Sequence, residues 1–479
     1  MSTEESGGTG PRSGYRTDTV AADAQDAPEG TAVRLAGRVV LWRRMGGLVF
    51  GHVQDHSGRV QMSLSRDELG AELFKEWSRA VKVGDFVGIA GSLYTTRLGE
   101  RTVAVSELTV LNRTVRALPD KWQGLSNVEA RYRRRYLDLL VNAESRERFR
   151  TRAKIIQRIR RFLDDNDFLE VETPILQEAA SGAAARPFVT RHNALGEDFY
   201  LRISPETLLK RVVVGSLDRV YELGRNFRNE GMDSAHLQEF TMLEWYAAYW
   251  DYRDNMTFIR ELVLAVLDEV LGTRTVTYDG IKLDFGADWP ELDYRTQITR
   301  RTGIDLTVVR DLPTLREHVA ELGLAVEEAA SYAGLVDLLY KKTVRPELIQ
   351  PCFLVHHPAE LAPLARRSDE DPTRLDMFQV VVNGWEIVKS YSELIDPREQ
   401  RLRLEEQAEL REAGDDETMM MEEDFIEAME YGMPPMSGLG LGIDRFVALL
   451  TDAPTLREVV LFPTMRGIRK GQTSPDDDT

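Results

Sequence analysis

The segment from Tyr221 to Tyr246 constrains the fold of this chain more than any other. Its pattern predicts two strands joined by a loop from about Gly231 to Gln238. On the second strand, alternation places four side chains on a single face: Phe240, Met242, Glu244 and Tyr246. Arg228 and Glu230 share a face of the first strand in the same way. Because unpaired charge is costly to bury, this face predicts either a polar binding site or a solvated sheet surface.

The chain has 479 residues, enough for two or three domains. Its apolar content of 42% is ordinary for a soluble globular protein, and its apolar runs are far shorter than the ~18 residues of a membrane span. Cys352 is the only cysteine, which excludes an intramolecular disulfide and a cysteine-based zinc site and predicts a cytoplasmic location. The net charge of −18 argues against general nucleic-acid binding, so any RNA contact needs local basic patches.

The first quarter of the chain predicts a tail followed by a small barrel. Residues 1–30 are rich in Ser, Thr, Gly, Asp and Glu without an apolar core, which indicates a disordered tail rather than a signal peptide. Residues 31–112 contain several short alternating strands and one helix, at about Asp67–Val81. This order predicts an oligonucleotide-binding (OB) fold, although an SH3-like barrel has a similar pattern.

Several stretches resemble one enzyme family. FRNEG at 227–231 and HLQEF at 236–240 resemble motif 2 of the class II aminoacyl-tRNA synthetases, and GLGLGIDR at 438–445 resembles motif 3. FYLRISPETLLKRVVVG and FQVVVNGWEIVKSYSELIDP resemble the bacterial class II lysyl-tRNA synthetases, and the resemblance extends over 31–466. It implies an α+β chain with an N-terminal OB-fold β-barrel and a catalytic domain built on an antiparallel sheet flanked by helices. The implied segments are a tail at 1–30, an anticodon-binding domain at 31–112, a connector at 113–135, a catalytic domain at 136–466 and a flexible tail at 467–479.

The resemblance implies that the chain activates L-lysine with ATP and transfers it to tRNA(Lys). The family's catalytic positions are Arg228, Glu230 and Arg445. Its ATP-binding positions are Arg228, Glu230, His236, Phe240, Glu386 and Arg445. Its lysine-binding positions are Gly182, Glu206, Arg228, Glu244, Tyr246, Tyr391 and Glu393. Glu386 also matches a ligand of Mg²⁺, which would neutralise the leaving pyrophosphate. Glu206 alone would equally fit an ordinary acidic residue in the first turn of a helix.

In the barrel, the resemblance implies anticodon contacts from Arg43, Phe50, Gln61 and Glu100. Such contacts combine an aromatic platform for base stacking with hydrogen-bonding groups for base edges. The alternative is that Phe50 belongs to the barrel core and Arg43 is a surface charge.

A helix, a strand and Pro174 resemble motif 1, through which the family forms homodimers. Basic residues are dense from Arg131 to Arg161. Most are expected on a solvated helix face, and some could contact tRNA phosphates or a dimer partner.

Three positions depart from the family pattern. Ala235 replaces an arginine that reaches the γ-phosphate, Gln379 replaces a second metal-binding carboxylate, and Lys389 replaces an asparagine near the substrate carboxylate. Two other functions therefore stay open: a paralogue that forms lysyl adenylate to modify a protein or metabolite, and a catalytically impaired RNA-binding regulator. An aspartate or asparagine enzyme of the same subclass would need a cationic pocket, which Tyr391 and Glu393 oppose.

Overall fold

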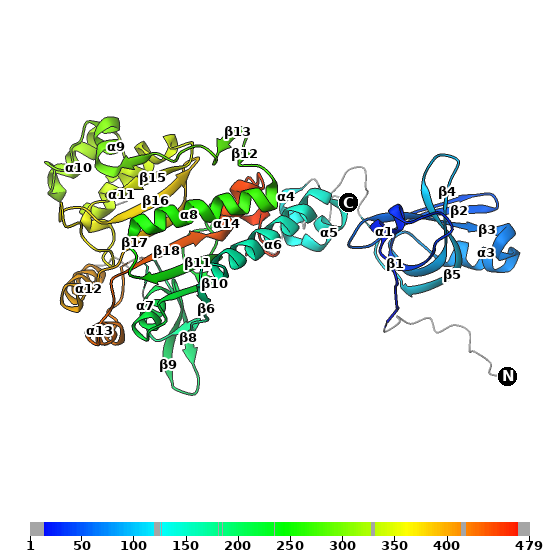
Figure 1. Cartoon of the computed structure of the whole chain (residues 1–479), viewed down its shortest axis with the longest axis horizontal. Helices are drawn as coiled ribbons and strands as arrows, with labels where there is room; N and C mark the ends of the chain where they lie inside the picture. The colour runs from blue at the N-terminus through cyan, green and yellow to red at the C-terminus, as the bar shows by residue number, and fades with distance from the viewer. Residues whose placement is uncertain are drawn as a thin grey trace. The chain divides into compact units, whose positions relative to one another are not determined.

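The computed structural model describes residues 14–118, 125, 127–180, 182–183, 185–233, 235–326, 331–412 and 418–467. The chain divides into two compact units, Met1–Gly124 and Leu125–Thr479 (Figure 1). No helix in these ranges is long and apolar enough to cross a membrane.

The first unit is a closed barrel with the strand order β1-β2-β3-β5-β4. Its strands are β1 (Ala32–Met45), β2 (Leu48–Gln54), β3 (Arg59–Ser65), β4 (Phe86–Thr95) and β5 (Arg101–Asn112), with α2 (Arg66–Leu69) and α3 (Ala71–Ala80) between β3 and β4. Alternate residues such as Val49, Val53 and Val60 fill the interior. Five strands closed in this order form the predicted OB fold.

The tail prediction is wrong for its second half. Residues 21–26 form α1 (Ala21–Asp26), whose Ala21 and Ala24 are buried in the barrel core. Asp55 anchors the start of this helix, because its Oδ2 accepts the Ala21 backbone N–H at 2.7 Å. Residues 1–13 of the predicted tail, and 468–479 of the C-terminal tail, lie outside the described residues.

The connector that we predicted over 113–135 is shorter than expected. Helix α4 (Val128–Arg133) belongs to the second unit. Its Tyr132 hydroxyl donates to Glu458 Oε1 at 3.1 Å, which ties it to the C-terminal end of that unit. Residues 119–124 and 126 of the connector are outside the described part of the chain.

The second unit is built on an eight-stranded sheet with the order β14-β15-β16-β17-β18-β11-β10-β6. Its strands are β6 (Leu169–Glu170), β10 (Arg219–Phe227), β11 (Glu239–Ala248), β14 (Glu291–Asp293), β15 (Cys352–Val355), β16 (Met377–Val382), β17 (Trp385–Ser392) and β18 (Met436–Gly442). All neighbours are antiparallel except β6 with β10 and β14 with β15. Smaller sheets are β7 (Leu176–Gln177), β8 (Phe188–His192) and β9 (Glu197–Leu201), and β12 (Thr275–Tyr278) with β13 (Ile281–Asp284).

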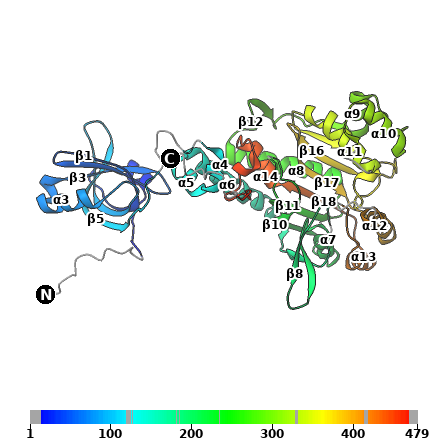
Figure 2. The ribbon, with the colours of Figure 1, turned by 180° about the vertical axis from the view of Figure 1, so that it is seen from behind.

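Helices cover this sheet on both faces. They are α5 (Arg135–Val141), α6 (Ala143–Asp164), α7 (Glu206–Val214), α8 (Tyr252–Val266), α9 (Tyr294–Thr302), α10 (Leu312–Glu321), α11 (Tyr332–Thr343), α12 (Pro397–Glu412), α13 (Glu423–Glu430) and α14 (Ile443–Leu450). The largest core lies between the central strands and α8, α6 and α14. Helices α9, α10 and α11 gather at the β15–β16 edge (Figures 1 and 2). Helices α7 and α13 pack on the opposite face from α8, in a separate apolar cluster.

Candidate active site

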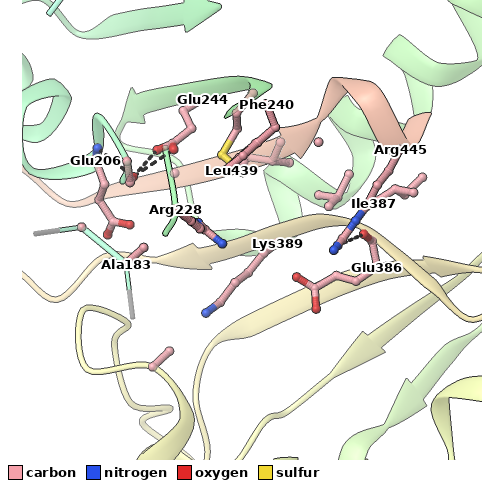
Figure 3. A pocket seen from close by; sticks show the side chains of 18 of the residues that line it. Ala183, Glu206, Arg228, Phe240, Glu244, Glu386, Ile387, Lys389, Leu439 and Arg445 are labelled. Carbon is pink, nitrogen blue, oxygen red and sulfur yellow. Dashed lines mark hydrogen bonds between the residues drawn. The ribbon is translucent and has the colours of Figure 1, made fainter. Parts of the chain in front are cut away.

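A cavity of about 310 Å³ opens on the face of the sheet opposite α8. Strands β11, β17 and β18 form its floor, and the segment after β10 and the start of α7 form its walls (Figure 3). It is lined by every active-site residue that the sequence predicted: Gly182, Glu206, Arg228, Glu230, His236, Phe240, Glu244, Tyr246, Glu386, Tyr391, Glu393 and Arg445.

Strand alternation explains why a charged face lies here. On β11, Leu243 and Trp245 are fully buried against the α8 core. The intervening Met242, Glu244 and Tyr246 line the cavity. The charged face is therefore not a solvated sheet surface but the wall of a polar cavity.

One end of the cavity is acidic, and its carboxyl groups are buried. Glu244 is 4% exposed, and burial raises the pKa of its carboxyl to about 8. The Ser204 hydroxyl donates to its Oε1 at 2.9 Å, and the Tyr246 hydroxyl donates to its Oε2 at 3.3 Å. These donors orient the carboxylate toward the cavity.

Two further carboxylates lie at this end. Glu206 begins α7, and its Oε1 accepts a hydrogen bond from the Tyr391 hydroxyl at 2.6 Å. Glu393 follows β17 and is buried, and this burial raises its pKa to about 8. Three acidic side chains and two tyrosines therefore surround a small volume that suits a ligand with more than one ammonium group.

Glycines keep this end open. A Cβ at Gly438 on β18 would lie 2.2 Å from Tyr246 Cε1 and 2.5 Å from Glu393 Oε1. Gly182 has φ +80°, and a Cβ there would crowd Glu206 and Ser204 at 3.1 and 3.2 Å. Any larger residue at either position would displace the acidic side chains.

Arg228 projects into the middle of the cavity (Figure 3). Its backbone N–H donates to Gln238 at 2.9 Å, so the strand pairing continues one residue beyond β10. Its guanidinium lies 5.1 Å from the Phe240 ring and makes no hydrogen bond or ion pair with a described side chain. Burial lowers the pKa of Arg228 below its usual range. An unpaired, half-buried cation with forked donors is suited to an anionic ligand.

The other end of the cavity carries Arg445, Glu386 and Phe240. Arg445 projects from α14 and donates from Nη1 to the Glu386 carbonyl at 2.9 Å. His236, on the segment between β10 and β11, pairs with Asp233 through Nδ1 and Oδ2 at 2.8 Å.

The three departures from the family pattern lie in or beside the cavity, and Lys389 Nζ is 5.9 Å from the centre of the Tyr391 ring. Ala235 and Lys389 line the cavity, whereas Gln379 does not. Gln379 lies opposite Lys389 in the β16–β17 pairing, and its amide donates to Glu386 Oε2 at 2.7 Å. Within the described ranges, no group of three or more His, Cys, Asp or Glu side chains could hold a metal ion.

Comparison with known proteins identifies the family. The profile described as class II tRNA synthetases (D, K and N) matches residues 127–466. The chain belongs to this family of class II tRNA synthetases. A second profile, the OB-fold nucleic-acid-binding domain of the tRNA anticodon type, matches residues 33–111.

Curated relatives of this class II synthetase cover nearly its whole length. A lysine–tRNA ligase of Chloroflexus aurantiacus is 47% identical over 94% of this chain and 93% of the relative. A lysine–tRNA ligase of Moorella thermoacetica is 45% identical over 95% and 93%. The lysine–tRNA ligase of Aquifex aeolicus is 45% identical over 94% of this chain and 75% of the relative.

The barrel of this class II synthetase brings its four predicted anticodon residues to one region. Arg43 lies directly opposite Phe50 across β1 and β2, and Phe50 projects outward between inward-facing Val49 and Gly51. Phe50 is thus not a core residue. Gln61 Nε2 donates to Glu100 Oε2 at 3.0 Å.

Sequence reasoning missed His52 in this region. Its Nε2 lies 2.8 Å from Glu100 Oε1, and His52 pairs directly with Gln61 across β2 and β3. Gln61 Oε1 has no hydrogen-bond partner in the described part of the chain. The period-2 spacing of His52 from Phe50 was the signal that could have found it. The cluster thus offers the Phe50 ring face and the Arg43 cation, together with the buried and unpaired Gln61 Oε1.

Replacement of Phe50 by Ala is expected to raise the KM for tRNA about 5- to 150-fold while leaving lysine-dependent ATP–pyrophosphate exchange unchanged. The reason is the loss of one base-stacking contact, ~1–3 kcal/mol. Aminoacylation and exchange are measured on the same preparation. Phe86→Ala serves as a matched control, because Phe86 is an exposed aromatic on β4, which is adjacent to neither β2 nor β3. An equal fall in exchange for Phe50→Ala would show a structural role instead.

Proposed function

We propose that this class II synthetase is a lysine–tRNA ligase, which activates L-lysine with ATP and transfers the lysyl group to tRNA(Lys). The observation that carries the proposal is the acidic end of the cavity: Glu206, Glu244 and Glu393 face the same space. Curated lysine–tRNA ligases that match over more than nine-tenths of the chain support it.

Lysine carries two ammonium groups and one carboxylate, and the cavity offers a counterpart for each. In the proposal, Glu206 binds the α-ammonium and Glu393 binds the ε-ammonium, with Tyr246 and Tyr391 as the walls. Arg228 binds the carboxylate. Glu244, which accepts a hydrogen bond from Ser204, adds a third carboxylate near the ammonium groups of lysine. An aspartate or asparagine substrate would place a carboxylate or amide against buried carboxylates, which is unfavourable.

Activation brings two anions together, so it depends on the cations of the cavity. A lysine carboxylate oxygen attacks the α-phosphorus of ATP, a new P–O bond forms, and pyrophosphate leaves. Arg228 holds the carboxylate and the α-phosphate in contact and stabilises the charge that develops there. Phe240 and Arg445 hold the adenine between them, and Glu230 and His236 bind around the triphosphate. No protein nucleophile is required.

In the proposal, the protein contributes one carboxylate ligand to Mg²⁺, that of Glu386. Mg²⁺ in nucleotide sites is bound by one or two carboxylates together with phosphate oxygens and waters. Glu386 lines the cavity and offers Oε1, because Oε2 accepts the Gln379 amide. This donor set fits an ion that arrives with ATP rather than one held by the protein alone. When bound, the ion would neutralise the leaving pyrophosphate.

Transfer uses the same cavity. A ribose hydroxyl of the terminal adenosine of tRNA attacks the lysyl carbonyl carbon, and AMP leaves. The barrel residues Arg43, Phe50, Gln61 and Glu100 select the tRNA by its anticodon. The proposal places the enzyme in the cytoplasm, where its tRNA substrate is used.

The proposed enzyme is a homodimer that associates through the motif 1 region. Three apolar side chains there are exposed in the single chain: Leu169, Ile175 and Leu176. A second copy of the chain would cover them, and sedimentation measurements of the molecular mass test this.

The direct test is aminoacylation of total tRNA with each labelled amino acid in turn. We expect lysine alone to be charged, and only onto tRNA(Lys). Exchange with lysine but no charging of tRNA would favour an adenylate-forming paralogue. Neither activity, with retained tRNA binding, would favour an RNA-binding regulator.

The departures at Ala235 and Gln379 predict weak ATP binding and a high Mg²⁺ requirement, not inactivity. Ala235 cannot contact a phosphate, and the neutral Gln379 is a poorer metal ligand than a carboxylate. Each lost charge-assisted contact is worth roughly 1.5–3 kcal/mol. Lysine-dependent exchange is measured across a magnesium titration for the wild type, Ala235→Arg and Gln379→Glu.

We expect both substitutions to lower the KM for ATP, and Gln379→Glu also to lower the Mg²⁺ concentration at half-maximal rate. Lysine KM is the internal control and should not change. An unchanged ATP KM in both variants would contradict the prediction.

A further inference from the structure

Lys210 lies behind the acidic end of the cavity and has no part in the chemistry described so far. It is one turn after Glu206 on α7 and is completely buried. Its Nζ is 2.6 Å from Glu206 Oε1 and also forms an ion pair with Glu393 Oε2. One ammonium therefore joins the two carboxylates that are proposed to receive the two ammonium groups of lysine.

Lys210 does not line the cavity, although both of its partners do. Its Nζ lies 5.9 Å from the ring centre of Tyr246, 5.7 Å from that of Tyr391 and 5.8 Å from that of Phe425 on α13. Three rings at this distance stabilise a cation and exclude water from it. The ammonium is thus fixed on the far side of the carboxylates and leaves their cavity side to a ligand.

The charges at this end explain why such a cation is needed. Three carboxylates would repel one another in a buried space, which favours their neutral forms. Burial is the main cause that raises the pKa of Glu393, and the attraction of Lys210 is the strongest influence in the opposite direction. Burial alone would lower the pKa of Lys210, but its two carboxylate partners outweigh burial and raise it. Lys210 therefore stays charged.

We propose that Lys210 is a positioning residue for substrate selection: it holds Glu206 and Glu393 apart and aimed into the cavity, so that each can receive one ammonium group of the substrate. The inference rests on the proposed function, because it assumes that lysine is the ligand.

The test replaces Lys210 with Met in the full-length protein and measures lysine-dependent ATP–pyrophosphate exchange. We expect the KM for lysine at pH 7 to rise about 100-fold, because Glu206 and Glu393 lose the partner that fixes their positions and lowers the pKa of Glu393. The KM for ATP is expected to change less than twofold, since the nucleotide end of the cavity does not contact Lys210. If Lys210→Met does not fold, Lys210→Gln takes its place.

A pH series separates this role from a structural one. The pKa of Glu393 is about 8 with Lys210 present and should be higher without it, so kcat/KM for lysine should rise with pH over a higher range in the variant than in the wild type when both are measured from pH 6.5 to 9.5. The other groups facing Lys210 are Tyr246 and Tyr391, whose pKa values lie far above this range. Glu244 is present in both proteins and titrates in both. Lys210→Arg, which keeps the charge, is expected to restore most of the lysine affinity at pH 7.

Arg135→Met is the matched control. Arg135 is also completely buried, pairs with Asp138 at 2.6 Å and lines no part of the cavity. We expect it to lower the melting temperature without a change in lysine KM or in its pH dependence.

The outcomes are distinct. An active wild type whose Lys210→Met variant keeps its lysine KM, or loses affinity equally at every pH, overturns this inference alone. A wild type that does not activate lysine overturns the proposed function and this inference with it.

Discussion

Replacement of Glu393 by Gln is expected to lower kcat/KM for lysine about 100- to 5,000-fold. Glu393 is 1% exposed, so an ammonium group that binds it is desolvated together with it. Removing one partner of such a buried pair typically costs ~3–5 kcal/mol, and ~1.4 kcal/mol corresponds to a factor of ten. Gln has the same shape without the charge. Lysine-dependent exchange at varied lysine and at varied ATP gives the two KM values, and that for ATP should change little.

Glu222→Gln is a close control for this substitution. Glu222 is a buried acidic residue on β10, directly opposite Glu244, but it pairs with Arg202 and does not line the cavity. Its loss should affect stability and not the lysine KM. Unchanged lysine kinetics in Glu393→Gln would remove Glu393 from the lysine pocket.

Replacement of Arg228 by Met is expected to lower kcat/KM for exchange by about 10³-fold or more. Arg228 is the cation in the middle of the cavity, and its guanidinium has no hydrogen-bond or ion-pair partner among the residues that the structure describes. Removal of one transition-state donor from a preorganised site typically lowers kcat by 10²–10³, and a guanidinium supplies two donors. Because the charge on the α-phosphate grows during attack, kcat should fall more than either substrate affinity.

Arg225→Met on the same strand controls for loss of a basic residue. Arg225 is partly exposed, lies 3.6 Å from Glu239 and does not line the cavity. We expect near wild-type exchange from it. If Arg228→Met changed only the lysine and ATP KM values and left kcat intact, Arg228 would be a binding residue without a part in the chemical step.

Period-2 alternation made the central part of the site predictable. It assigned Glu244 and Tyr246 to one face of β11, and the structure places both in the cavity with Leu243 and Trp245 on the other side. The predicted barrel is also confirmed, because the inward positions of each short strand are apolar and close on one core.

The partners of the basic residues could not be predicted in this way. Charge density between Arg131 and Arg161 indicated a mostly solvated helix face. Instead Arg135 pairs with Asp138, and Arg148 is buried against Glu458, more than 300 residues away in the sequence. Helical periodicity fixes which face a residue is on but contains no information about a distant segment that covers it.

The role of Lys210 was not predicted from the sequence, for a related reason. Its position on α7, four residues after Glu206, is typical of an ordinary helical ion pair. Only the tertiary fold brings Glu393, the residue after β17, to the same ammonium. Helices α1 and α4 were missed entirely, because short helices carry little periodic signal.

The two ends of the cavity are made from different kinds of structure, and this affects how well the enzyme discriminates between similar amino acids. The acidic end comes from α7, β11, β17 and β18, whereas Glu230 and His236 lie on the irregular segment between β10 and β11. Because strands are rigid, the distance between the groups that bind the two ends of the amino acid is fixed, and the pocket selects for side-chain length. One missing methylene in such a pocket changes discrimination by only about 10- to 200-fold. Ornithine, which has the charges of lysine on a shorter chain, is therefore the amino acid most able to be mistaken for it.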